Sequence, residues 1–284
     1  MKIDKLIDQY LAVSPQISGT QLQALRRMRK DSIGKCKVPV TPKNIIDWMR
    51  ERNITVSPAT AYGDLVYMRG MLEYAQIGLG IEGVTAVPIA EALPILRRQR
   101  LIAASNTRER IPSASEHAMI IAYLRGTKVK PEVIDVIDYQ YKSGWRVGET
   151  CRVIWGDYDP AKRTMLVRDM KHPRKKTGHN VRLVVLDEAA EIIERQPRLT
   201  NLPDERIFKV ESTAVSAVYT RACKELRIVG LHLHDSRARV VTHLQSQGYS
   251  DSQIILVTGH ETTRMAKARY GRMTADDFPR RAAQ

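Results

Sequence analysis

The stretch Leu231–Met273, LHLHDSRARVVTHLQSQGYSDSQIILVTGHETTRMAKARYGRM, decides which fold and chemistry this chain carries. It places His234 three residues before Arg237, and Tyr270 ten residues after the Gly-His pair that ends at His260. A guanidinium forms bidentate hydrogen bonds with phosphate oxygens, and an imidazole exchanges protons near neutral pH. A phenol becomes a nucleophile when a base or nearby cations activate it. These groups together suit one chemistry, in which cations clamp a phosphate while a hydroxyl attacks its phosphorus.

A second arginine stands upstream, in the segment SGWRVGETCRVIWGDYD at residues 143–159. Gly144 ends the preceding helical pattern and the residues after it begin another, so Arg146 is expected near a helix N-terminus. At that position the positive end of the helix dipole adds to the bidentate contact of an arginine with phosphate. Glu149, about one turn further on, is expected to hold Arg146 or a neighbour in place.

These residues resemble the signature of the tyrosine recombinases, the phage integrase family. The upstream segment is similar to that family's Thr-Gly-x-Arg-x-Gly-Glu motif with a following Trp-x-Asp, matched here by Trp155 and Asp157. The downstream stretch is similar to its His-x-Leu-Arg-His and Leu-Gly-His motifs and its late tyrosine. Three positions depart from the pattern, since Ser236, Ala238 and Thr258 stand where the family has leucine, histidine and leucine.

The resemblance implies a role for each candidate residue. Arg146 and Arg237 would bind the non-bridging oxygens of the scissile phosphate. His234 would act as general base, and His260 would hydrogen-bond the phosphate. Tyr270 would be the nucleophile, forming a 3′-phosphotyrosine intermediate that a 5′ hydroxyl later resolves. Neither a metal nor another cofactor is expected for this reaction.

Between Val153 and Leu186 the hydrophobic period changes to three short β-type runs, RVIW, RTMLVRD and NVRLVVL. They predict a small three-stranded antiparallel sheet, with the basic tip KHPRKKTGH between the second and third strands. In the family such a hairpin carries a lysine into the minor groove, where the lysine protonates the leaving 5′ oxygen. Lys171 at the end of the second strand is our assignment, and Lys175 and Lys176 are the alternatives.

The first hundred residues show helical periodicity and two clear helix-start signals. Thr41-Pro42 and Ser57-Pro58 each place an N-cap residue before a proline at the first helical position. A further helix is expected over Ile89–Ala103. A helical bundle at this place in the chain resembles the SAM-like core-binding domain that precedes the catalytic domain in tyrosine recombinases.

We therefore expect a mainly α fold with a small three-stranded antiparallel sheet, in the α+β class. A helical core-binding domain is predicted over residues 1–104, a polar linker over 105–115 and the catalytic domain over 116–284. Basic residues in both domains are expected to contact DNA phosphates: Arg26, Arg27, Lys30, Arg97, Arg98, Lys175, Lys176 and Arg264. A solvated helix face is the other interpretation of the two clusters in the first domain.

The chain has 284 residues and a formal net charge of +15, which favours a polyanionic partner such as nucleic acid. It contains no apolar run near the roughly 18–20 residues of a membrane span, so no membrane partner is expected. Cys36, Cys151 and Cys223 are far apart and lack metal-ligand spacing, so neither a disulfide framework nor a zinc site is expected. A reducing prokaryotic cytoplasm is the expected location.

The resemblance implies double-stranded DNA attachment sites as the substrate and a homotetramer on two paired sites as the active assembly. Accessory DNA-bending or directionality proteins are further partners that it allows. A phage or mobile-element integrase is the favoured task. Two other interpretations stay open: a type IB topoisomerase that uses the same active site in one protomer, and a non-catalytic regulator in which residues 249–270 form a helix-turn-helix.

Overall fold

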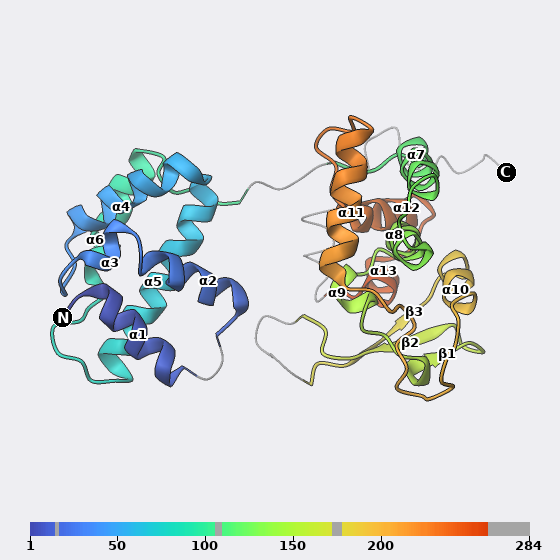
Figure 1. The fold of residues 1–284 in the computed structure, drawn as a ribbon, viewed down its shortest axis with the longest axis horizontal. Helices are drawn as coiled ribbons and strands as arrows, with labels where there is room; N and C mark the ends of the chain where they lie inside the picture. Colours follow the sequence, from blue (N-terminus) through green and yellow to red (C-terminus); the bar gives the residue numbers. More distant parts are fainter. Residues whose placement is uncertain (15–16, 106–109, 172–177, 261–284) are drawn as a thin grey trace. The chain divides into compact units, whose positions relative to one another are not determined.

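The computed structural model describes residues 1–14, 17–105, 110–171 and 178–260 of the chain (Figure 1). The chain divides into two compact units, residues 1–106 and 107–284. Their described parts are mainly helical and contain a small three-stranded antiparallel sheet, which confirms the predicted fold class. Among the helices in these ranges, none is both long enough and apolar enough to cross a membrane.

The first unit is a bundle of helices around one hydrophobic core. Its helices are α1 (Ile3–Val13), α2 (Gly19–Met28), α3 (Ser32–Lys35), α4 (Pro42–Thr55), α5 (Pro58–Ile77) and α6 (Val87–Arg98). The two predicted helix starts are confirmed, because the hydroxyls of Thr41 and Ser57 accept N–H groups in the first turns of α4 and α5. The prediction that the last helix reaches Ala103 is wrong. Its end comes at Arg98 because Arg100 takes a left-handed backbone conformation, with φ of 55°.

A buried carboxylate ties three helices of this unit together. Asp64 on α5 is only 4% exposed. Arg52 on α4 donates to it at 3.0 and 2.9 Å, and Arg27 on α2 donates at 3.0 Å. A buried charge without such partners would be strongly unfavourable. Arg27, which the sequence suggested as a DNA contact, therefore has a structural partner inside the protein.

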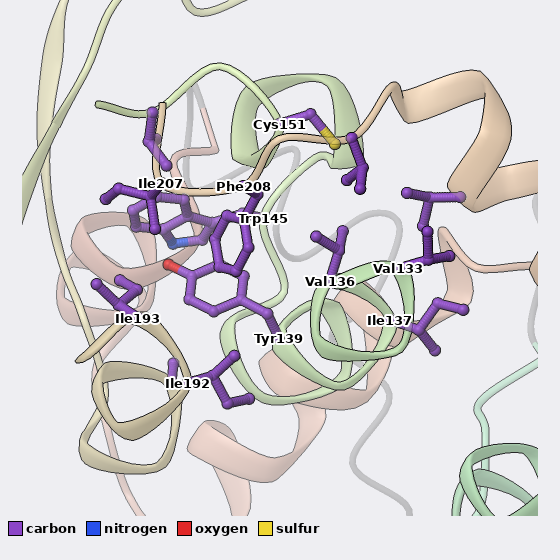
Figure 2. Close-up of a cluster of buried hydrophobic side chains, with 14 of the residues drawn as sticks. Val133, Val136, Ile137, Tyr139, Trp145, Cys151, Ile192, Ile193, Ile207 and Phe208 are labelled. Atoms are coloured by element: carbon purple, nitrogen blue, oxygen red, sulfur yellow. The ribbon is translucent and has the colours of Figure 1, made fainter. Parts of the chain in front are cut away.

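The second unit is built around α8. Its helices are α7 (Ala114–Arg125), α8 (Pro131–Ser143), α9 (Val147–Thr150), the short 3-10 helix η1 (Trp155–Asp157), α10 (Asp187–Glu194), α11 (Ser212–Glu225), α12 (Asp235–Ser246) and α13 (Asp251–Thr258). Helix α8 packs against α7, α9, α10, α11 and α12. Figure 2 shows part of this core, in which the Tyr139 ring lies edge-on to Trp145 and tilted against Phe208. Helix α7 begins at Ala114, inside the predicted linker, because Ser113 and Glu116 form a capping box.

The sheet consists of β1 (Tyr158–Asp159), β2 (Thr164–Val167) and β3 (Val181–Val184), each antiparallel to its neighbour. The prediction of a first strand at residues 152–155 is wrong. Backbone groups of that segment pair with the chain after α10 instead, since Trp155 donates to Glu205 and Val153 accepts from Ile207. The second strand ends at Val167, so Lys171 lies beyond it and not at its end.

A carboxylate also organises the loop between α10 and α11. Glu205 accepts hydrogen bonds from the backbone N–H groups of Leu199 at 2.8 Å and Thr200 at 3.0 Å, and it forms an ion pair with Lys209. The hydrogen bond from Lys209, followed by those from the two N–H groups, lowers the pKa of Glu205 to about 2 from an ordinary 4.5. All of these contacts favour the ionised carboxylate.

This depressed pKa makes the loop's contribution to stability depend on pH. Because the folded pKa is lowered, the contribution is complete above pH 4.5 and is lost as the pH falls towards 2. We expect Glu205→Gln to lower the melting temperature at pH 6, and we expect its difference from wild type to shrink between pH 5 and pH 3. Thermal unfolding followed by circular dichroism across this range checks the expectation. A difference that does not change with pH would contradict it.

Candidate active site

Arg146 is held at the start of α9, as the sequence predicted. Gly144 ends α8 in the left-handed conformation with φ of 66°, and a Cβ on it would lie 2.9 Å from the Val240 side chain of α12. This tight turn brings Arg146 to the N-cap position of α9. The Nη1 of Arg146 then donates to Oε1 of Glu149 at 2.9 Å. Glu149 is 3% exposed, so a buried carboxylate holds the partly exposed arginine in place.

Arg237 on α12 is almost completely buried, with 1% of its surface exposed. Its Nη1 donates to the carbonyl oxygens of Gly144 at 2.9 Å and Thr258 at 2.5 Å, and its Nε donates to Nε2 of His260 at 3.0 Å. The last carbonyls of a helix lack partners within it and form the negative end of its dipole. The C-terminus of α13 is therefore a favourable place for the buried cation. Arg237 joins three segments that are far apart in the sequence.

His260 is placed by the end of α13. Gly259 caps that helix in the left-handed conformation, with φ of 67°, and turns the chain so that His260 points back into the unit. The imidazole is 5% exposed, and its Nδ1 lies 2.7 Å from Oγ1 of Thr258. Trp145 fixes the same helix end, because its Nε1 donates to the carbonyl of Val257 at 2.7 Å.

Lys171 contacts the candidate site through its backbone N–H. The two arms of the hairpin continue past the strands, where Met170 donates to the carbonyl of His179 at 2.8 Å. The N–H of Lys171 then donates to Oε1 of Glu149 at 3.4 Å, and its side chain is exposed. Glu149 therefore contacts both Arg146 and the backbone that carries Lys171.

His234 stands at the N-cap position of α12, one residue before the helix begins. His234 and Arg237 differ in environment, since His234 is exposed and Arg237 is buried. The predicted nucleophile Tyr270 lies outside the described residues, as do Lys175, Lys176 and Arg264. In the first unit the predicted DNA contacts Arg26, Arg27, Lys30, Arg97 and Arg98 are all exposed.

Three tyrosines of the second unit are poor candidates for a nucleophile. Burial raises the pKa of Tyr139 well above its ordinary value and also raises that of Tyr219. Burial, followed by a hydrogen bond to Glu194, raises the pKa of Tyr158 to about 12. Each of these phenols is therefore harder to ionise than a free tyrosine.

Sequence reasoning missed two residues of this region, Trp145 and Thr258. Trp145 lies directly before Arg146, and its position gave no hint that the indole reaches α13. Thr258 was noted only as a departure from the family's leucine. The contact of its hydroxyl with His260 is visible only in the fold. Within the described ranges, no group of three or more His, Cys, Asp or Glu side chains could hold a metal ion.

A family model described as the phage integrase family matches residues 101–276, which is more than half of the chain. The chain belongs to the phage integrase family. This confirms the resemblance to the tyrosine recombinases. No curated protein matches the chain in sequence.

Solved structures are similar to the chain over nearly its whole length. An integrase of the Tn1549 transposon in complex with circular intermediate DNA has 16% identity and a TM-score of 0.71, with 98% of this chain and 97% of that chain covered. A lambda integrase dimer bound to a COC′ core site has 15% identity, a TM-score of 0.70, and coverage of 95% and 77%. A lambda integrase tetramer bound to a Holliday junction has 16% identity, a TM-score of 0.68, and coverage of 93% and 78%. At these identities the likeness is one of fold.

Proposed function

We propose that this member of the phage integrase family is a site-specific recombinase that cleaves and rejoins double-stranded DNA through a 3′-phosphotyrosine intermediate on Tyr270. The observation that carries the proposal is the buried Arg237, joined to His260 and to the segment that presents Arg146. Burying a cation is costly even when it is hydrogen-bonded, so a structural role alone is a weak reason to keep an arginine there. Two cations carried by segments that contact one another fit an anionic substrate well.

The chemistry follows from the charge that develops at phosphorus. Arg146 and Arg237 would neutralise the non-bridging oxygens, which is the electrostatic stabilisation that usually contributes most to catalysis. A free tyrosine has a pKa of about 10, so Tyr270 needs a base and nearby cations to attack at neutral pH. His234 is the proposed base. Lys171 is the proposed acid for the leaving 5′ oxygen, with Lys175 and Lys176 as alternatives.

The tyrosyl phosphate ester conserves the energy of the broken phosphodiester, so rejoining needs no ATP. We propose that residues 1–104 form a core-binding domain, that 105–115 are a linker, and that 116–284 form the catalytic domain. The basic residues Arg26, Arg27, Lys30, Arg97 and Arg98 would contact phosphates through the first domain.

The proposed partners are DNA attachment sites and three further copies of the chain. Lambda integrase forms a tetramer on a Holliday junction, and a similar tetramer on two paired sites is our proposal for this chain. The proposed task is integration or excision of a phage or mobile element in a prokaryotic cytoplasm, helped by accessory DNA-bending or directionality proteins. A stable tetramer without DNA, measured by mass, would count against assembly on paired sites.

Strand exchange between two marked duplexes tests the proposed function. Both duplexes carry a candidate attachment site from the DNA that flanks the gene, and each carries a different label. We expect products that join the two labels, without ATP and with a chelator present. Relaxation of supercoiled plasmid without joined products would identify a topoisomerase instead. Tight binding with neither product would identify a non-catalytic regulator.

A further inference from the structure

The hydroxyl of Thr258 has two hydrogen-bond partners and only one hydrogen. Thr258 is fully buried on α13, and its Oγ1 lies 2.7 Å from the carbonyl oxygen of Ile254 and 2.7 Å from Nδ1 of His260. A carbonyl oxygen only accepts, so the hydroxyl hydrogen goes to Ile254, as is common for threonine in helices. The imidazole must therefore donate, and the proton of His260 lies on Nδ1.

The other side of the imidazole leads independently to the same tautomer. Nε2 of His260 lies 3.0 Å from Nε of Arg237. A guanidinium has donors and no acceptor. Nε2 must therefore carry a lone pair and accept, which leaves the proton on Nδ1. Two contacts on opposite edges of one ring thus require the same neutral form of His260.

We infer that Thr258 is a positioning residue, which holds His260 in the Nδ1–H form so that its Nε2 accepts from Arg237 and orients the guanidinium before DNA binds. The hydroxyl acts through His260 and touches no substrate. The inference rests on the proposed function, because it assigns the orientation of a phosphate-binding arginine. It concerns a position where this chain departs from the leucine of the family motif.

Removing the hydroxyl would reverse the polarity of this hydrogen-bond chain. Without Oγ1, a buried proton on Nδ1 would lose the acceptor that Thr258 provides, which is unfavourable. The alternative tautomer carries its proton on Nε2, where it would point at the N–H of Arg237 across 3.0 Å. Either tautomer would weaken the hydrogen bonding that orients the guanidinium of Arg237. Before His260 can donate to a phosphate, its Nε2 must gain a proton and give up its hydrogen bond with Nε of Arg237.

Nitrogen-15 NMR of histidine-labelled, DNA-free protein measures the tautomer directly, with His260→Gln used to assign the signal. We expect Nδ1–H in wild type and in Thr258→Ser, which keeps the hydroxyl. We expect Thr258→Val to lose that form and to cleave a nicked DNA substrate more slowly by roughly tenfold to a hundredfold, the effect known for groups that orient metal-bound imidazoles. Thr220→Val on α11 is the control for loss of a threonine-to-carbonyl bond, because the exposed Thr220 donates to the carbonyl of Ser216 and has no histidine contact among the described residues.

The outcomes separate this inference from the proposed function. Wild-type His260 protonated on Nε2 would overturn it, whether or not Thr258→Val folds. Equal cleavage by wild type and Thr258→Val would also overturn it, as would a Thr258→Ser variant that behaves like Thr258→Val. Wild-type protein that cleaves no DNA would defeat the proposed function, and the tautomer would then lose its proposed catalytic meaning.

Discussion

Arg237→Lys is expected to reduce DNA strand cleavage by roughly 10²–10³-fold, the effect of removing a preorganised donor to developing negative charge. The arginine reaches Gly144 and Thr258 through Nη1 and His260 through Nε, and this geometry fixes the plane of the guanidinium. A lysine keeps the charge but has a single nitrogen, so it loses the fork that reaches several acceptors at once. Single-turnover cleavage of a labelled nicked duplex measures the loss.

Arg239→Lys is the matched control for this prediction. Arg239 lies on the same helix, stacks over the ring of Tyr141 at 4.3 Å and donates to a carbonyl of α8 at 3.3 Å. We expect its replacement to change the cleavage rate much less than Arg237→Lys does, and cleavage is compared at a temperature at which both variants are folded. Cleavage by Arg237→Lys within twofold of wild type would remove the basis for placing this arginine on the phosphate.

Trp145→Ala is expected to lower the free energy of unfolding by about 3–5 kcal/mol, the usual cost of truncating a large buried aromatic residue. Trp145 is 2% exposed, and its ring lies edge-on to Tyr139. Its Nε1 also donates to the carbonyl of Val257, so the change would release the end of α13 that positions His260. Urea unfolding followed by circular dichroism measures the difference.

Replacing tryptophan by phenylalanine separates the hydrogen bond from the packing. Trp145→Phe leaves the buried carbonyl of Val257 without its donor, which costs about 1–3 kcal/mol beyond the lost ring area. Trp155→Phe is the control, because the structure gives its buried indole N–H no acceptor among the described residues. We expect Trp145→Phe to destabilise the protein more than Trp155→Phe. Equal losses would show that the bond to α13 contributes little.

The elements that the sequence predicted well have strong local signals at both ends. Gly144 was expected to end a helix, and it does so at the end of α8, which Pro131 opens. The prediction of a first strand at residues 152–155 failed for a different reason. These residues are β-formers, but their backbone pairs with the chain near residue 205, and a local pattern carries no information about that pairing. The proline-led starts of α4 and α5 were predicted correctly because their signals are local too.

Apart from the contact between Glu149 and Arg146, the sequence predicted the residue types of the candidate site and not their contacts. The motif positions identified Arg146, Arg237 and His260, because their spacing resembles a known family. That Arg237 is buried and bound to His260 depends on how α12 packs on α13, which no local pattern specifies. The contact between Thr258 and His260 is close in sequence, but it needs the left-handed turn at Gly259 to form.

Covalent trapping on a nicked suicide substrate tests the central claim most directly, since only a nucleophilic side chain leaves protein attached to DNA after denaturation. The wild-type chain should give an adduct at the 3′ phosphate on denaturing gels, and Tyr270→Phe should give none while still binding the DNA. An adduct that persists in Tyr270→Phe would place the nucleophile elsewhere. Tight binding by wild type with no adduct on any flanking DNA would contradict the recombinase chemistry itself.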